Sequence, residues 1–261
     1  MRHRIFLYLL AIPLLFGLAT GCGQAKKKEA QKQTKLQQQS LDLAKAYEGL
    51  QGLRAKVAEE QASLEELKKV PKRKLSDEQK QQIAQLPDQI KADSEAVATA
   101  YDTVQDKLSN FLNFALNEAP KAPETAGALE IYSKEAMVNA EDAVQKVGDY
   151  KKAIEILQTA ESYYESAGLT PYPPLKDRMQ KYDELRFITK DRFEAAKKGM
   201  NESEVAAITG VPYYMNKKHE HGVDFWLFPR RDGGAAAFYF NKHGKLYSKR
   251  WDAVKPKVHK D

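Results

Sequence analysis

The sequence is poor in cysteine. Its single thiol, Cys22, excludes an intramolecular disulfide because no second cysteine exists among the 261 residues. The sequence also lacks several spacings that mark reaction centres, namely a HExxH zinc motif, a glycine-rich phosphate loop, a nucleophile elbow and a Cys–His pair. The sequence therefore does not favour an enzyme, and we expect no metal and no organic cofactor.

Long apolar runs are missing too. The most apolar stretch, Ile5 to Leu18, is interrupted by Pro13 and is shorter than the ~20 residues that a membrane-spanning helix needs. Two arginines precede this stretch, and the small residues 19–21 follow it. A basic start, an apolar centre and a small-residue end are typical of a secretory signal, so residues 1–21 are predicted to be a signal peptide.

The segment LATGC, residues 18–22, resembles the lipobox of bacterial lipoproteins. The resemblance implies that Cys22 becomes the first mature residue and carries acyl chains that hold the protein on a bilayer. An uncleaved or plainly secreted chain is the alternative. Gly23 stands where an acidic residue commonly retains such lipoproteins at the inner membrane. The family pattern therefore implies an outer-membrane lipoprotein that faces the periplasm.

Charge is distributed unevenly along the chain, whose formal net charge is +6. Residues 192–261 contain 14 basic and 8 acidic residues, whereas residues 22–191 are slightly acidic. A basic C-terminal segment favours acidic partners, such as anionic lipid head groups, an acidic protein face or a polyanionic cell-wall polymer. Nucleic acid would suit the charge, but an exported chain seldom meets it, so we do not expect it as a partner.

The first half of the mature chain has a helical composition. Residues 22–35 are polar and without periodicity, which indicates a flexible tether that carries the lipid. Residues 36–118 are predicted to form an antiparallel, coiled-coil-like hairpin, with a break at 70–74 and a capped restart near Ser76. Two arms of an ordinary helical bundle are the alternative. The seam recurs every seven residues, at Leu36, Leu43, Leu50, Val57 and Leu64 and again at Ile90, Val97, Val104 and Phe111, and is interrupted at Gln39 and Glu60.

Residues 125–190 are predicted to be helical. The stretch that starts at Gly148 resembles the second helix of a tetratricopeptide repeat, through Gly148, Asp149, Tyr150, Ala153, Leu157 and Ala160. The small alanines would allow close helix approach, and the larger side chains would fill the remaining space. Because no second copy is visible, we expect one repeat-like helical pair rather than an array.

The residue composition changes again in residues 192–261, where strand-forming residues alternate with turn residues. Asn201 is predicted to cap a short helix that ends at Gly210, and residues 232–234 and 241–244 are hairpin signals. We predict a short helix and a meander of three antiparallel strands. The whole chain is then of the α+β class, a long helical hairpin or bundle followed by a small module.

The module contains a recurring set of short elements, namely Gly199-Met200-Asn201, Glu204-Val205, Gly210-Val211-Pro212, Phe225-Trp226, Phe238 to Phe240 and Gly244-Lys245. Through these elements it resembles the SmpA/OmlA, or BamE-like, domain of small outer-membrane-assembly lipoproteins. The resemblance implies an α/β sandwich that makes protein contacts and has no catalytic machinery.

Aromatic and basic residues on the module predict a contact patch. Since successive strand residues face opposite sides, one of Phe225 and Trp226 is expected in the core and the other outside. The patch comprises Tyr213, Tyr214, Trp226, Arg230 and Arg231.

A second candidate site is the run His219-Glu220-His221, which could place two imidazoles on one strand face. No third ligand stands at a fixed spacing, and His243 and His259 are distant in sequence, so a solvated loop is favoured over a metal site.

Together these features predict a non-catalytic adaptor or scaffold, anchored in the outer membrane through Cys22, that binds a periplasmic or outer-membrane protein. The alternative is a binding protein for an anionic envelope component, either peptidoglycan or lipid.

Overall fold

The protein is described here by a computed structural model that covers residues 23–220 and 222–253, and its architecture is α+β as predicted. The α-helices are α1 Gly23–Lys69, α2 Asp77–Glu118, α3 Pro123–Val147, α4 Tyr150–Ala167, α5 Pro173–Arg186, α6 Lys190–Ala195 and α7 Glu202–Thr209. Two short 3-10 helices are η1 Lys72–Lys74 and η2 Tyr214–Asn216, and the strands are β1 Lys217–Glu220, β2 Val223–Pro229, β3 Ala235–Phe240 and β4 Leu246–Arg250. Within the described ranges, no helix is both long and apolar enough to cross a membrane.

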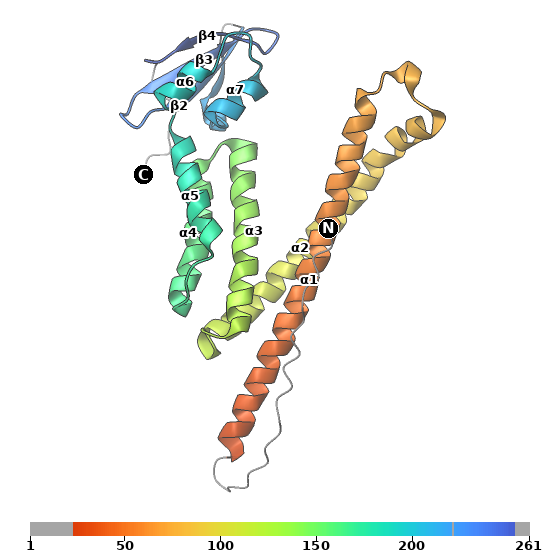
Figure 1. Ribbon diagram of the computed structural model, residues 1–261, viewed down its shortest axis with the longest axis vertical. Helices are drawn as coiled ribbons and strands as arrows, with labels where there is room; N and C mark the ends of the chain where they lie inside the picture. Colours follow the sequence, from red (N-terminus) through yellow and green to blue (C-terminus); the bar gives the residue numbers. More distant parts are fainter. Residues whose placement is uncertain (1–22, 221, 254–261) are drawn as a thin grey trace.

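Helices α1 and α2 form the antiparallel hairpin that the heptad pattern predicts (Figure 1). Leu36, Leu43 and Leu50 of α1 are fully buried and share one core with Val104 and Phe111 of α2. A seven-residue spacing keeps these side chains on the helix face that meets the partner helix. The sequence therefore determines which side of each arm is covered.

The break between the arms also follows local sequence. Lys72–Lys74 form the 3-10 turn η1, and α2 begins after Ser76 with a complete capping box. The backbone N–H of Gln79 donates to the Ser76 hydroxyl, while the Gln79 side-chain oxygen accepts from the Ser76 backbone N–H. Pro87 lies inside α2, which continues through it to Glu118.

The predicted flexible tether, residues 22–35, is wrong over the residues that the structure describes, because α1 begins at Gly23. Alanine, lysine, glutamine and glutamate favour helix, and the end of α2 lies opposite this segment. The Lys32 ammonium pairs with the Glu118 carboxylate, and the Lys35 ammonium lies 4.2 Å from the centre of the Phe114 ring. These contacts extend the helix beyond its apolar seam. Cys22 and the predicted signal peptide lie outside the described residues.

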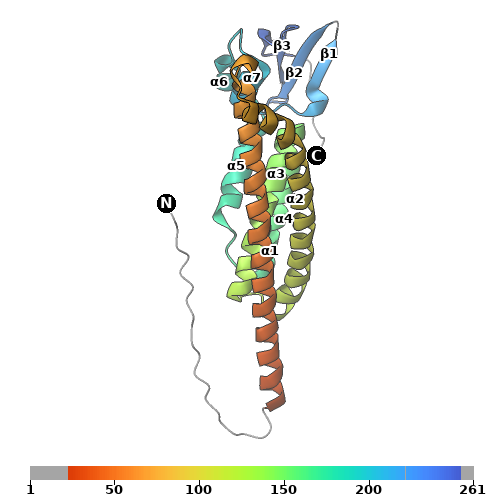
Figure 2. The same ribbon diagram turned by 90° about the vertical axis from the view of Figure 1, so that its right-hand side faces the viewer.

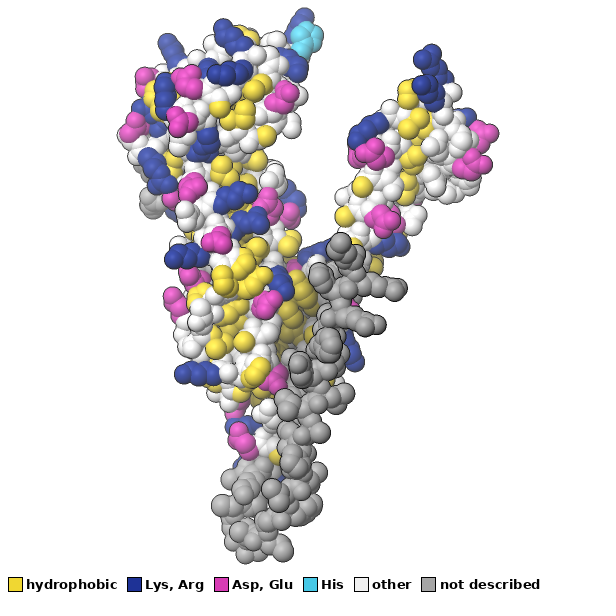
Figure 3. Space-filling model, in the orientation of Figure 1, with side chains coloured by type: hydrophobic (Ala, Val, Ile, Leu, Met, Phe, Trp, Pro, Cys, Tyr) yellow, Lys and Arg dark blue, Asp and Glu magenta, His cyan; other side chains and the backbone are white. Residues whose placement is uncertain are grey.

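Helices α3, α4 and α5 pack beside the base of the hairpin, and their apolar side chains belong to the same core. The residues that carry the repeat-like pattern line this packing, since Ala153, Leu157 and Ala160 are fully buried. Beyond this base, the hairpin projects freely, and a wide notch separates its tip from the C-terminal module (Figures 1 and 3). The two predicted alternatives are therefore combined: the base belongs to a bundle, and the distal part is a free hairpin.

The C-terminal sheet has four strands in the order β1-β2-β3-β4, all antiparallel, rather than the three that we predicted. The additional strand is β1, Lys217–Glu220, whose last two residues belong to the histidine run that we predicted to be a solvated loop. An edge strand is exposed along one side and tolerates charged side chains, so it leaves no apolar alternation in the sequence.

Helices α6 and α7 cover one face of the sheet (Figure 2). The core between them contains Ile188, Phe193 and Val205 from the helical side and Trp226, Phe228, Phe238 and Phe240 from the strands. As predicted, Asn201 caps α7, with Glu204 completing a capping box, and Gly210 ends the helix. Since Ile188 already belongs to this core, the module begins slightly before the predicted boundary at residue 192.

Candidate functional site

The structure does not assemble the predicted contact patch, because its residues lie in different environments. Trp226 is only 4% exposed, and its ring centre lies 4.6 Å from that of Phe240. The choice of Trp226 as a contact residue was wrong. Its neighbour Phe225 points to the opposite face of the sheet, in keeping with strand alternation.

Arg230 and Arg231 both pair with carboxylates of the protein itself. The Arg230 guanidinium pairs with the carboxylates of Asp232 and Asp252 and lies 4.5 Å from the Trp251 ring centre. These hydrogen bonds raise the pKa of Arg230, and the reciprocal interaction lowers the pKa of Asp232. Arg231 pairs with Asp183 of α5. We therefore remove Arg230 from the contact patch, since its side chain is largely covered within the module, whereas Arg231 remains at the surface.

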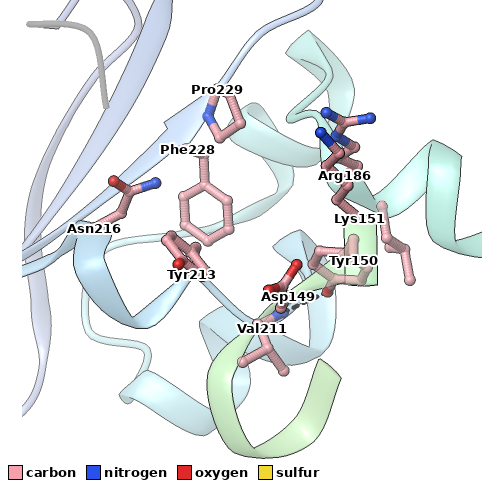
Figure 4. Close-up of a pocket in the computed structure, with 11 residues that line it drawn as sticks. Asp149, Tyr150, Lys151, Arg186, Val211, Tyr213, Asn216, Phe228 and Pro229 are labelled. Carbon is pink, nitrogen blue, oxygen red and sulfur yellow. Dashed lines mark hydrogen bonds between the residues drawn. The ribbon is translucent and has the colours of Figure 1, made fainter. Parts of the chain in front are cut away.

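Tyr213 and Tyr214 lie at the start of η2 in an edge-to-face pair with ring centres 4.9 Å apart. Tyr214 is 52% exposed, whereas Tyr213 is half-buried and lines a shallow hollow beneath the sheet (Figure 4). Phe228, Asn216 and Tyr150 line the same hollow. Of the five predicted patch residues, Tyr214 and Arg231 are the two whose side chains remain widely exposed.

The hollow lies where the module meets the helices. The Val211 backbone N–H donates to the Tyr150 hydroxyl at 2.8 Å (Figure 4), and burial raises the pKa of that hydroxyl. A Cβ atom added to Gly148 would lie 2.3 Å from the carbonyl oxygen of Pro212. Two chain segments that approach this closely form a rigid junction, so we assign a structural role to the hollow.

The outer face of the sheet presents a row of aromatic side chains that the sequence analysis missed. Phe225 of β2 lies beside Tyr239 of β3, with ring centres 5.6 Å apart, and Tyr239 lies 6.5 Å from Tyr247 at β4. Tyr247 is 43% exposed, and the other two rings are half-buried. We call Phe225, Tyr239 and Tyr247 the aromatic row.

Cationic side chains border the aromatic row. In the strand register Lys218 of β1 is opposite Phe225, and Arg250 of β4 is opposite Ala237. Paired residues share a face, so both cations lie on the outer side of the sheet. The sequence did contain a signal for this face, because every second residue of a strand points to the same side. Aligning these residues across three strands, however, requires the strand register.

The histidine run does not form a metal site in the part of the chain that the structure describes. His219 lies in β1, and its Nδ1 is 2.7 Å from a carboxylate oxygen of Asp224 on β2. His221 lies outside the described residues. Across residues 23–220 and 222–253, no group of three or more His, Cys, Asp or Glu side chains is arranged to hold a metal ion.

Comparisons of the chain with protein-family models, with curated proteins and with solved structures found no match. The surface best suited to binding is the aromatic row with Lys218 and Arg250, which combines ring area for contact with cations for orientation.

Proposed function

We propose that this protein is an outer-membrane lipoprotein that acts in the periplasm as a non-catalytic adaptor for envelope protein assembly or organisation. The observation that carries the proposal is the two-sided character of the sheet: one face is buried under α6 and α7, while the other exposes the aromatic row between Lys218 and Arg250. Aromatic residues and arginine are enriched at the centres of protein interfaces.

The position of the anchor supports this role. Helix α1 begins directly after Cys22, and its first residues lie at the end of the molecule opposite the module (Figure 1). An acylated Cys22 would therefore hold the base of the hairpin at the membrane and place the sheet away from it. This geometry suits a protein that presents a binding surface to a periplasmic partner.

The anchor is tested by Cys22→Ser. The variant cannot take acyl chains, so we expect loss of labelling by a radioactive fatty acid and transfer of the protein out of the outer-membrane fraction. An exposed-site control, Ser63→Ala, should retain both properties. Continued lipid labelling of the Cys22→Ser protein would refute the assignment of the anchor.

The binding face is tested by purification of the chain from detergent-solubilised membranes. Replacing Phe225 and Tyr239 together with serine should reduce the yield of a stoichiometric co-purifying protein by more than about tenfold, because central aromatic residues dominate interface energetics. Leu41→Ser is the matched control, since Leu41 is 57% exposed on α1. Circular dichroism must show folded protein in each case. Equal partner yield from both variants would exclude this face.

Binding of an anionic envelope component is the second candidate, favoured by Lys218 and Arg250 beside the aromatic row. It predicts that the purified chain sediments with isolated peptidoglycan or with anionic lipid vesicles, without any protein partner. Replacing Lys218 and Arg250 with glutamine should then abolish sedimentation. If this variant instead retains full affinity for such material, the second candidate is excluded.

A further inference from the structure

The free tip of the hairpin carries an unusual concentration of positive charge. Between Lys68 and Lys74 the sequence is Lys-Lys-Val-Pro-Lys-Arg-Lys, and η1 has no buried residue. Lys68 and Lys69 pair with Glu65 and Glu66 of their own helix. Within the described residues, no ion pair joins the three cations of η1 to a carboxylate.

An apolar hollow of about 420 Å³ lies beside these cations. Its apolar lining comes from both helices and the turn, namely Leu67, Val70, Leu75 and Ile83. Each of these four side chains is half-buried, so the tip leaves part of its apolar surface exposed. The hydrocarbon stems of Lys68, Lys72 and Lys80 complete the wall. A yellow apolar stripe below the blue cations at the tip is visible in Figure 3.

We propose that this tip, residues 67–83, binds the surface of an anionic phospholipid bilayer. Charge complementarity selects the occupant: the cations of η1 would meet lipid phosphates, while Val70 and its apolar neighbours would enter the layer just beneath them. Lysine and arginine suit this boundary because their stems lie along apolar surface while their charged ends remain in the head-group region. A soluble polyanion would satisfy the cations and leave the apolar hollow unused.

The tip is separate from the proposed anchor. Helix α1 contains 47 residues, and at about 1.5 Å per residue it places the tip some 70 Å from Gly23. The inference therefore does not depend on acylation of Cys22 or on the sheet face. It gives the molecule a second membrane contact at the opposite end of its longest element.

Vesicle sedimentation tests the proposal, with the chain from Gly23 onward, which retains every described residue and lacks both the apolar leader and the cysteine. We expect binding to phosphatidylcholine vesicles that contain phosphatidylglycerol, and at least tenfold weaker binding to pure phosphatidylcholine. Each cation near an anionic surface contributes roughly a fivefold factor, so Lys72→Gln, Arg73→Gln and Lys74→Gln together should lower the partition coefficient on the order of 100-fold. Higher salt should weaken binding by the unchanged chain.

A matched control removes the same charge elsewhere. Lys197, Lys198 and Lys242 are exposed on the C-terminal module, and changing all three to glutamine should alter binding less than about threefold. Equal losses for the two triple variants would overturn the proposal by assigning binding to net charge alone.

Val70→Ser tests the apolar part. We expect about a tenfold loss of vesicle binding with unchanged binding to soluble polyphosphate, because only the bilayer offers an apolar layer to Val70. If Val70→Ser leaves vesicle binding intact and polyphosphate competes fully, the tip is a polyanion site and the bilayer assignment is wrong. Circular dichroism of each variant should match that of the unchanged chain, since the substituted side chains lie outside the main core.

Discussion

The carboxylate of Glu135 on α3 is buried and fully paired. Glu135 is 1% exposed, and the two terminal nitrogens of Arg54 on α1 donate to its two oxygens at 2.6 and 2.8 Å. This hydrogen bonding raises the pKa of Arg54. The pair joins the hairpin to α3, and its side-by-side geometry fixes how α1 is rotated against the bundle.

Arg54→Ala should destabilise the protein by about 3 kcal/mol, because it leaves a buried carboxylate without its partner. Replacing both members, Arg54→Met with Glu135→Leu, should restore most of the loss. The exposed pair Lys134 and Glu130 supplies the control, and Lys134→Ala should cost less than about 0.5 kcal/mol. Urea denaturation measures all three changes. Equal effects of Arg54→Ala and Lys134→Ala would contradict the assigned role.

Glu60, which interrupts the heptad seam, is in a less favourable environment. It is 8% exposed, and one carboxylate oxygen accepts from the Gln89 amide at 2.8 Å while the other has no hydrogen-bond partner among the described residues. Burial, and then the neighbouring Asp93, raise the pKa of Glu60, whereas Lys56 lowers the pKa of Asp93. The distal hairpin therefore contains a carboxylate that is destabilised when ionised.

Glu60→Gln should raise the thermal midpoint at neutral pH. In the unchanged chain, the pKa of Glu60 in the folded state lies above its ordinary value of 4.5, so folding favours the protonated carboxyl. The stability contributed by that protonated form is lost as the pH rises through the folded pKa. The advantage of glutamine should therefore shrink as the pH falls toward 4.5. Asp93, with its lowered pKa, acts only at lower pH.

Thermal melts at neutral and acidic pH measure this difference, with the exposed neighbour Glu59→Gln as the control. A stability difference between Glu60→Gln and the unchanged chain that is the same at both pH values would contradict the assignment.

Among the elements, the turn between α3 and α4 joins the two cores. Gly148 ends α3 with a φ of 68° and lies directly against the backbone of Pro212 and Tyr213. Gly168 ends α4 with a similar φ of 63°, but only the flexible end of Lys121 lies nearby. The two glycines therefore have the same backbone requirement and different surroundings.

Gly148→Ala should destabilise the protein more than Gly168→Ala. Both changes incur the left-handed backbone cost of about 1–2 kcal/mol, and Gly148→Ala adds a clash with the module of roughly 1–3 kcal/mol. Hydrogen exchange should also become faster in residues 210–216 for Gly148→Ala alone. Equal stability losses and unchanged exchange would show that the junction is not tightly packed.

Features set by neighbouring residues could be predicted from the sequence. The heptad seam, the capping box at Ser76 and the cap at Asn201 all form as expected, because each depends on spacings of three to seven residues. The strand β1 was missed because its residues are all polar, although its partner β2 follows directly along the chain, and the helical start of α1 was missed because its partner Glu118 is distant in sequence.

The candidate site was harder to predict for the same reason. Composition indicated that the module has an aromatic and basic surface, but only the register shows that Trp226 is inside and Tyr239 outside. Arg230 was expected at the surface because Asp252, one of its partners, is distant in sequence, whereas Arg231 stays exposed while it pairs with Asp183. Long-range pairing, rather than local pattern, decides which charges a surface can offer.

At the scale of the whole molecule, the proposals assign separate roles to three regions. The base of α1 follows the proposed lipid anchor, the hairpin tip carries cations beside an apolar hollow, and the module exposes the aromatic row (Figures 1 and 3). The bundle of α3, α4 and α5 shares one core with the base of the hairpin, and the turn at Gly148 joins it to the separate core of the module. We interpret the protein as a spacer that holds a binding face at a set distance from its anchor.

Site-specific photocrosslinking in intact cells tests the central claim, that the outer sheet face binds a protein partner, most directly. A photoreactive amino acid replaces Tyr247 of the aromatic row in one strain and Val138 of α3 in another; their side chains are 43% and 42% exposed. We predict a discrete adduct with one envelope protein from position 247 and none from position 138. Equal adduct yields at the two positions, or an adduct from position 138 alone, would contradict the account.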